Sequence, residues 1–471
     1  GPMTTQTLQD IIGKEPLHWR GDRDGIEEFN GAFLSLLGDD TELTDDEMQE
    51  FEDFLATIHY PPNPFRNLDN SLPNNLPLDG HFTTGRFAPA GNPLPNGNAV
   101  AGLSNYRNSG LDGGLQCVTC HTLPTGAGPD LELVVFSLQP VPTGPNGEHH
   151  LAVVSVDGST NVTIKIPQLR NGYEKTGFNT TQLANTQGFG YLHDGSVDSL
   201  ERFLAEPAFS VNSDQQIANL VAFMLAFSGS DLPQGSLANP FEPLGVASLD
   251  THAAVGTQLT IDSSNFSSAP VIDELNTLLA LADSGAVGMV ASGVRVGLAR
   301  GYRYDGAGNW QSDRAAEQET TDALRTGTLS GGAMTFTVVA DGMQTRVGID
   351  RDEDGAFDRD EIEGCSDPAD PAVTPPGPAC GTFVRGDCND DGNLDISDPV
   401  ALLDSLFSGG GVPACVDACD GNDDGGMNIA DVIYLLSHQF SMGADPAPPF
   451  PDCGVDPTPD ASGCDTFTSC P

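Results

Sequence analysis

Residues 117–121 read Cys-Val-Thr-Cys-His, and this stretch anchors the predicted fold of the N-terminal half of the chain. Two thiols at this spacing can add to the two vinyl groups of one haem, and the adjacent His can then ligate the iron. A redox dithiol or half of a zinc site could begin in the same way, but no second Cys-x-x-Cys follows to complete a zinc site. The motif therefore predicts one covalent haem c attached to Cys117 and Cys120, with His121 as the proximal ligand.

Two further motifs follow this pentapeptide. Residues 164–171 read Ile-Lys-Ile-Pro-Gln-Leu-Arg-Asn, and residues 190–203 read Gly-Tyr-Leu-His-Asp-Gly-Ser-Val-Asp-Ser-Leu-Glu-Arg-Phe. In this order, the three motifs resemble the bacterial dihaem cytochrome c peroxidase and MauG superfamily, over roughly residues 97–228. The resemblance implies a mainly α cytochrome c-like domain over 97–228, with Arg170 and His193 at the haem edge or on its distal side.

The sixth ligand of the iron stays open at this point. Residues 213–227 carry apolar side chains at helical spacing behind a capping Ser213 or Asp214, which predicts the last helix of that domain. The resemblance leads us to expect a Met before this helix, but residues 196–212 contain neither Met nor His. The candidates are His193, His149 and His150, or no protein ligand. A ligated iron would only pass electrons, whereas an open iron would bind peroxide; the catalytic residues are left unassigned.

The N-terminal segment repeats part of this pattern. His18 precedes an Ile-Glu-Glu-Phe run much as His193 precedes Leu200 to Phe203, and residues 43–58 align with residues 212–227 at a constant offset of 169. Thr44 and Glu47 also form a capping box. We expect residues 4–60 to be the latter half of a cytochrome c-like repeat without its own CxxCH, joined to the next domain by a Pro/Asn/Gly-rich linker over 61–96.

The middle of the chain predicts a small β-rich α+β domain. A second linker covers 229–247, and the domain covers 248–348, with a helix at 271–281 and strands at 287–291, 294–304, 322–328 and 334–339. No catalytic pattern is present there.

Three acidic segments fit the twelve-residue calcium loop. Such a loop places oxygen ligands at positions 1, 3, 5, 7, 9 and 12 and a Gly at position 6, where the chain bends sharply. The first loop lies in the segment 349–371, and the other two are related by an offset of 33 within the module 381–471. The predicted ligands of about three calcium ions are Asp350, Asp352, Asp354, Ala356, Asp358 and Glu361; Asp387, Asn389, Asp391, Asn393, Asp395 and Asp398; and Asp420, Asn422, Asp424, Gly426, Asn428 and Asp431.

Each of the last two loops is followed by an apolar helix, over 400–407 and 432–440. The first loop resembles a thrombospondin type 3-like calcium repeat, and the paired loops resemble a type I dockerin pair. The second resemblance implies an α calcium-binding module with a cohesin-like or cell-surface partner. The eight cysteines from Cys365 onward predict up to four disulfides and therefore an oxidising, exported location: periplasmic, cell-surface or extracellular.

The net charge of −48 excludes a nucleic-acid binder, because 19 basic residues cannot neutralise many phosphates against 67 acidic ones. No apolar run approaches the length of a membrane span. The sequence favours an exported c-type haem protein that transfers electrons to a redox partner protein through an N-terminal haem domain and is attached by its calcium tail. Two alternatives remain: a peroxidase-like enzyme with an open iron, and an extracellular adhesion or assembly protein with a structural haem.

Overall fold

A computed structural model describes residues 3–470, apart from residues 20, 22, 129–130, 135–136, 141–152, 156–162, 177–187, 237, 296, 365, 376–381, 459–462 and 465–466. The chain divides into two compact units, Gly1–Val255 and Gly256–Pro471. His149 and His150 lie outside the described residues.

The core of the first unit is the crossing of α3 (Ala99–Asn108) and α6 (Asp214–Leu225). The two backbones approach closely at Gly102, where a Cβ would lie 2.0 Å from the carbonyl oxygen of Asn219. Ser213 caps α6 by accepting a hydrogen bond from the backbone N–H of Gln216 at 3.2 Å, which confirms the predicted start of this helix. The rings of Tyr106, Phe223 and Phe227 fill the crossing; Tyr106 meets both Phe rings edge-on, and the two Phe rings are tilted against each other.

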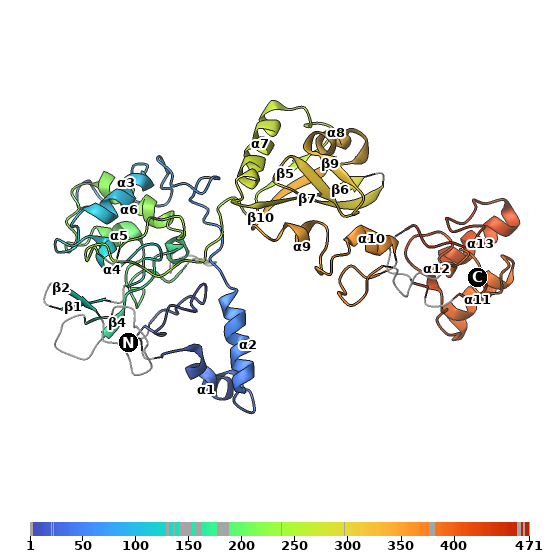
Figure 1. The fold of residues 1–471 in the computed structure, drawn as a ribbon, viewed down its shortest axis with the longest axis horizontal. Helices are drawn as coiled ribbons and strands as arrows, with labels where there is room; N and C mark the ends of the chain where they lie inside the picture. The colour runs from blue at the N-terminus through green and yellow to red at the C-terminus, as the bar shows by residue number, and fades with distance from the viewer. Residues whose placement is uncertain are drawn as a thin grey trace. The chain divides into compact units, whose positions relative to one another are not determined.

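Apart from α2 (Asp45–Ala56), the remaining elements of this unit are short (Figure 1). The capping box of Thr44 and Glu47 forms as predicted at the start of α2, whose buried side packs with Leu17 and Ile26 in a small separate core. The helices are η1 (Ile26–Phe29), α1 (Asn30–Ala32), η2 (Phe33–Leu37), α2 (Asp45–Ala56), α4 (Cys117–Cys120), η3 (Gly172–Lys175) and α5 (Leu200–Leu204). Antiparallel pairs join β1 (Leu131–Val134) to β2 (Ser137–Pro140), and β3 (Val153–Ser155) to β4 (Thr163–Lys165).

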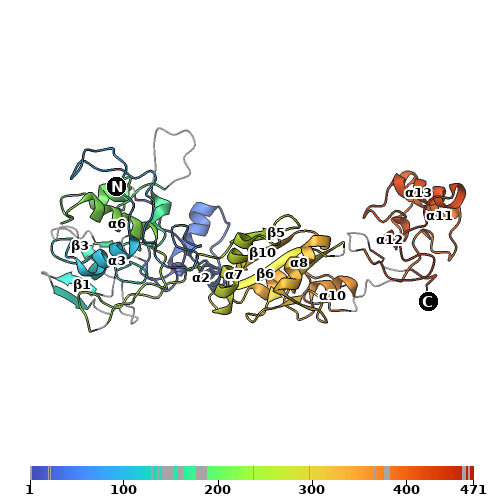
Figure 2. The same ribbon diagram turned by 90° about the horizontal axis from the view of Figure 1, so that it is seen from above.

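The second unit contains an antiparallel sheet of six strands in the order β5-β10-β6-β7-β8-β9. Helices α7 and α8 pack against the sheet (Figure 2). The core includes Trp310, Tyr302 and Phe336, and α9 contacts β6 and β7. The strands are β5 (Gln258–Ile261), β6 (Gly288–Arg295), β7 (Leu298–Tyr304), β8 (Asn309–Ser312), β9 (Gln318–Thr320) and β10 (Met334–Val339); the helices are α7 (Ala269–Asp283), α8 (Thr321–Gly331) and α9 (Gln344–Gly348).

The C-terminal part of the second unit consists of loops and short helices. These are α10 (Asp358–Glu363), α11 (Ser397–Leu403), η4 (Asp404–Ser408), α12 (Val416–Cys419) and α13 (Ile429–Ser441). Three disulfides join Cys388 to Cys419, Cys415 to Cys464, and Cys453 to Cys470. The other two C-terminal cysteines, Cys365 and Cys380, lie outside the described residues.

The predicted fold class, which combined mainly α cytochrome c-like domains, a small β-rich α+β middle domain and an α calcium-binding module, is wrong. The chain is mixed α/β, with 31% helix, 13% strand and the six-stranded sheet. In the middle region, the sheet gains a first strand at Gln258–Ile261, and the run 322–328, predicted as a strand, forms helix α8. Among the described residues, no helix is both long and apolar enough to cross a membrane.

Candidate functional sites

Cys117 and Cys120 lie one turn apart on α4, and their thiols are not bonded to each other. Burial, with the Asp112 carboxylate adding to it, raises the pKa of Cys117 to about 11. A redox-active dithiol needs the opposite, a thiolate with a lowered pKa. The surroundings of the pair therefore do not favour a redox-active dithiol.

His121 ends this turn with one ring nitrogen already engaged. Its Nδ1 lies 2.8 Å from the carbonyl oxygen of Gly126 and 3.1 Å from that of Pro167, and the hydroxyl of Tyr106 donates to its backbone carbonyl. Nε2 makes no hydrogen bond within the described part of the chain. A metal-ligating His usually donates its other ring N–H to a carbonyl or carboxylate, which fixes the ring and the tautomer. The two thiols and this imidazole are thus a donor set that fits a covalent haem.

The carbonyl of Pro167 belongs to the motif at 164–171, which connects three distant parts of the first unit. Lys165 is buried, and its Nζ donates to the carbonyl oxygens of Lys14 and Pro16, each at 2.7 Å. Arg170 is also buried: it forms an ion pair with Asp10, donates to Ser248 Oγ at 2.9 Å, and lies 4.3 Å over the ring of Tyr60. As placed, Arg170 ties the N-terminal segment to the motif.

His193 lies beside the same motif. Its Nε2 is 2.9 Å from the carbonyl oxygen of Lys165, and its ring meets Trp19 edge-on at 4.9 Å. Its side chain is therefore held by protein atoms at the nitrogen that would otherwise face a metal. His18, at the start of the partial repeat, packs edge-on against Phe29 at 4.8 Å.

Sequence reasoning missed the partners of these residues. Asp10 and Arg170 are 160 positions apart, and no pattern in the sequence links them. The same is true of Ser248, and of Asn63, whose amide donates to Asn171 Oδ1 at 3.2 Å.

The first acidic loop, 350–361, gathers carboxylates around one point. Oxygen atoms of Asp350, Asp352 and Asp354 all lie within 4.8 Å of one another. Glu361, at position 12, is fully buried, and its Oε2 has no hydrogen-bond partner in the described structure; the same holds for Oδ2 of Asp352 and of Asp354. Burial, together with these neighbouring acids, raises the pKa of Glu361 to about 7. Asp358 turns outward to Arg351, and Ala356 offers its backbone carbonyl at position 7.

The two tail loops have the same internal hydrogen bonds as each other. The position 1 carboxylate of Asp387 accepts from the N–H groups of Asp391 and Gly392, and that of Asp420 accepts from Asp424 and Gly425, at 2.8–3.2 Å. At position 12, Asp398 accepts from the N–H groups of Asn389 and Asp395, and Asp431 accepts from those of Asn422 and Asn428. All four carboxyl groups are buried, and burial raises the pKa of Asp398 and of Asp431 to about 6.

All three loops also share an uncommon backbone. Position 4 has a positive φ in each loop although it is not glycine: 63° at Glu353, 57° at Asp390 and 60° at Asp423. Position 6 is a glycine with positive φ, at 95°, 81° and 81° in Gly355, Gly392 and Gly425. This sharp bend turns successive oxygens toward one centre, as a calcium loop requires.

The predicted ligands in the odd positions face their own loops. Asn389 Nδ2 donates to Asp391 Oδ2, and Asn422 Nδ2 donates to Asp424 Oδ2, each at 3.0 Å. Asn393 and Gly426 occupy position 7, where the ligand atom is the backbone oxygen. At position 9, Asp395 accepts from Ser397 N and Asn428 caps α13.

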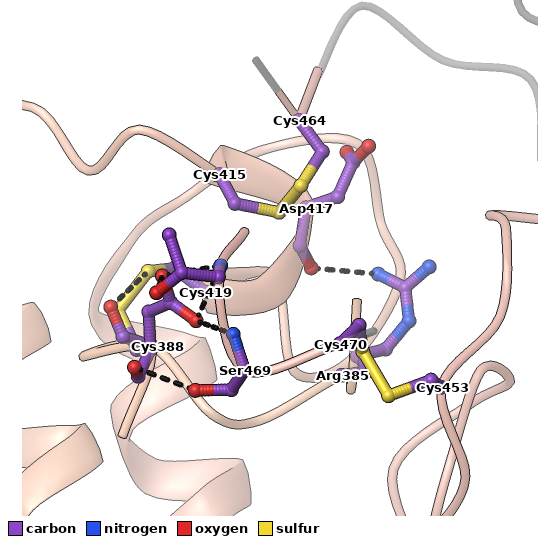
Figure 3. The surroundings of a disulfide bond; sticks show 11 residues. Arg385, Cys388, Cys415, Asp417, Cys419, Cys453, Cys464, Ser469 and Cys470 are labelled. Atoms are coloured by element: carbon purple, nitrogen blue, oxygen red, sulfur yellow. Dashed lines mark hydrogen bonds between the residues drawn. A yellow bond between two sulfur atoms is a disulfide. The ribbon is translucent and has the colours of Figure 1, made fainter. Parts of the chain in front are cut away.

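Outside the loops, the tail is held together by Arg385 and the disulfides (Figure 3). Arg385 is fully buried and donates to the carbonyl oxygens of Asp417 and Asp420; its Nη2 lies 2.9 Å from carboxylate oxygens of Asp423 and Asp456. Asp390 accepts from the backbone N–H groups of residues 468 and 469 at 2.7–2.9 Å. The segment that follows α13 is thus linked to position 4 of both tail loops: residues 468 and 469 bind Asp390, and Asp456 shares Arg385 with Asp423.

Comparisons of the chain with family models, with curated proteins and with solved structures find no match.

Proposed function

We propose that this chain is an exported c-type haem protein that transfers electrons to a redox partner protein and carries a calcium-stabilised C-terminal attachment module. The observation that carries the haem proposal is the imidazole of His121, whose Nδ1 is fixed by two backbone carbonyls at the end of the Cys-x-x-Cys turn. This arrangement leaves Nε2 as the nitrogen able to ligate iron.

A bound haem would supply a one-electron couple. The chain's own part is to attach the group through Cys117 and Cys120, to ligate it through His121, and to keep the ligand ring from rotating. The carbonyls of Gly126 and Pro167 serve the last purpose. Gly126 has a φ of 71°, and a Cβ there would meet Leu169 at 2.7 Å, so the turn that supplies this carbonyl depends on glycine.

A second candidate function, peroxidase-like chemistry at an open iron, is favoured by one observation. The Nε2 of His193 is already bonded to the carbonyl of Lys165, so this residue does not offer its usual ligand atom. If no other side chain takes the sixth position, a small ligand such as peroxide could reach the iron.

Optical spectra separate these functions. The protein would be produced with cytochrome c maturation machinery and measured oxidised and reduced, with and without carbon monoxide. A low-spin spectrum that carbon monoxide does not change supports electron transfer, whereas a high-spin ferric band and carbon monoxide binding support the open iron. A C117A/C120A variant should lose covalent haem, and H81Q, in which the His81–Glu201 pair is broken, is the matched control that should keep it. A wild-type protein without haem would refute both functions.

The calcium proposal rests on the shared backbone of the three loops and their converging carboxylates. Titration calorimetry on the metal-free chain should give about three calcium ions bound. The attachment partner we propose, a cohesin-like or cell-surface protein, would then bind the tail only when calcium is present, and binding that survives chelation would count against it.

A further inference from the structure

The loop 350–361 lies against the sheet of the second unit, and its contacts there go beyond those of a calcium repeat in a linker. Asp350 N donates to the carbonyl of Thr345 at 3.1 Å, and Asp358 N donates to that of Ile349 at 2.8 Å. Ile349 is fully buried, and Thr345 on α9 accepts a hydrogen bond from Arg303 of β7 at 2.9 Å. The entrance of the loop is therefore fixed to the sheet.

The exit of the loop is fixed as well, through α10. Arg359 N donates to the carbonyl of Asp313 at 3.0 Å, and Ala315 N donates to Asp360 Oδ2 at 2.7 Å. Glu363 binds Arg314 and the buried Arg359 together. Residues 313–315 directly follow β8, so the helix that carries Glu361 is bonded to the end of that strand.

Asp313 carries the connection into the sheet. Its carboxylate accepts from Arg300 Nε at 2.6 Å and from the backbone N–H of Gly301 at 2.9 Å, both on β7. Asp313 thus joins the sheet to α10, the helix that carries Glu361. In the loop, three carboxylate oxygens have no hydrogen-bond partner in the described structure, namely Oδ2 of Asp352, Oδ2 of Asp354 and Oε2 of Glu361, and the Glu361 side chain is fully buried. A buried carboxylate oxygen without a partner is costly, and a bound cation removes that cost.

We propose that the ion bound by 350–361 is a structural metal of the sheet domain, which holds α9 against β7 and α10 against the end of β8. This inference rests on the proposed calcium site and adds that the sheet depends on it. Calcium fits better than magnesium, since the loop has the spacing and the sharp glycine bend of a calcium loop, whereas magnesium usually keeps several of its waters and binds through one or two carboxylates.

Trp310 of β8 is the natural reporter. It is fully buried and lies three residues before Asp313, and the chain has only one other tryptophan, Trp19. In a W19F background, chelation of calcium from the full chain should change the emission of Trp310 and lower the thermal midpoint that it reports. Calcium at a thousand times its dissociation constant should raise the folded-to-unfolded ratio about a thousandfold. Magnesium at the same concentration should restore little of the signal.

Matched variants locate the effect. E361Q and, separately, D352N should each remove one calcium equivalent in calorimetry and abolish the Trp310 response. D398N, at position 12 of a tail loop, should also remove one equivalent but leave the response intact.

The outcomes separate this inference from the proposed function. If E361Q and D352N remove one equivalent while Trp310 and its midpoint ignore calcium, the loop binds the ion and the structural role is wrong. If neither variant changes the stoichiometry, the site itself is wrong and the inference falls with it.

Discussion

The loop 350–361 and the two tail loops share one backbone but have different supports. Each has a positive φ at position 4 and a glycine with positive φ at position 6. The first loop is braced by hydrogen bonds to α9 and to residues 313–315, which follow β8, whereas the tail loops are braced by a disulfide, Arg385 and the segment after α13. The twelve residues thus set the shape of the loop, while its surroundings decide what the loop stabilises.

The largest effect should come from removing the arginine at the centre of the tail. R385M removes a fully buried cation and leaves the partly buried carboxylates of Asp423 and Asp456 without it, which should cost about 3–5 kcal/mol of the tail's unfolding free energy. Denaturant unfolding followed by far-UV circular dichroism, with Trp310 emission for the sheet, would measure this. The exposed pair of Arg351 with Asp358 gives the control: R351M should cost at most about 1 kcal/mol. If R385M lowered the unfolding free energies of the tail and of the sheet equally, the two parts would not be stabilised separately.

Breaking the disulfide between the tail loops should have the next largest effect. The C388A/C419A variant opens a ring with a separation of 31 residues and should cost about 2–4 kcal/mol. We expect weaker calcium binding by the tail loops and no change in the Trp310 response. The C453A/C470A variant opens a shorter ring of 17 residues and should lose about 0.5 kcal/mol less. A calorimetric titration unaffected by either variant would show that the disulfides do not support the loops.

Glycine substitutions at position 6 test the shared backbone itself. G355A and G392A each force an alanine into a positive φ, where no atom lies closer than 3.6 Å, so the cost is conformational and about 1–2 kcal/mol in both loops. The measurement is the calcium affinity of each variant at its own loop. Costs that differ by more than this range would mean that the loops are alike only in φ.

The smallest expected effect is a difference in stability between substitutions at position 4 of a tail loop and of the first loop. D390A removes a carboxylate that accepts from the backbone of residues 468 and 469, and should destabilise the tail by about 1 kcal/mol. E353A at the equivalent place in the first loop removes only a distant partner of Arg346, at 3.9 Å, and should change stability by less than about 0.5 kcal/mol. Thermal unfolding of both variants would show the difference. A larger loss of stability in E353A than in D390A would contradict a supporting role for the contact between Asp390 and residues 468 and 469.

Local features of this chain could be predicted from sequence, and those that depend on distant residues could not. The capping residues Ser213 and Thr44 each act within three residues, so the pattern suffices. The run 322–328 is predicted as a strand, but Thr320 caps it by accepting from Ala323 N, and a helix forms. The predicted fold class failed because it took the helical content of the N-terminal and C-terminal parts from family resemblances and expected only a small sheet between them, whereas the sheet has six strands.

The candidate haem site likewise has residues that a local motif predicts and residues whose positions depend on distant partners. The cysteines and His121 are set by one pentapeptide, whereas the position of Arg170 depends on Asp10 and Ser248. A motif that suggested an arginine at a haem edge could not reveal that this arginine is neutralised by a carboxylate from the start of the chain.

The order of the cysteines in the tail determines what happens when a protease cuts it. The three rings, 388–419, 415–464 and 453–470, overlap in sequence, so every peptide bond from residue 388 to residue 470 is spanned by at least one disulfide. A single cut anywhere in this stretch leaves both fragments covalently joined. Nicked molecules would therefore run as intact chains on a non-reducing gel and separate only after reduction, so that the tail tolerates damage that would detach an uncrosslinked module.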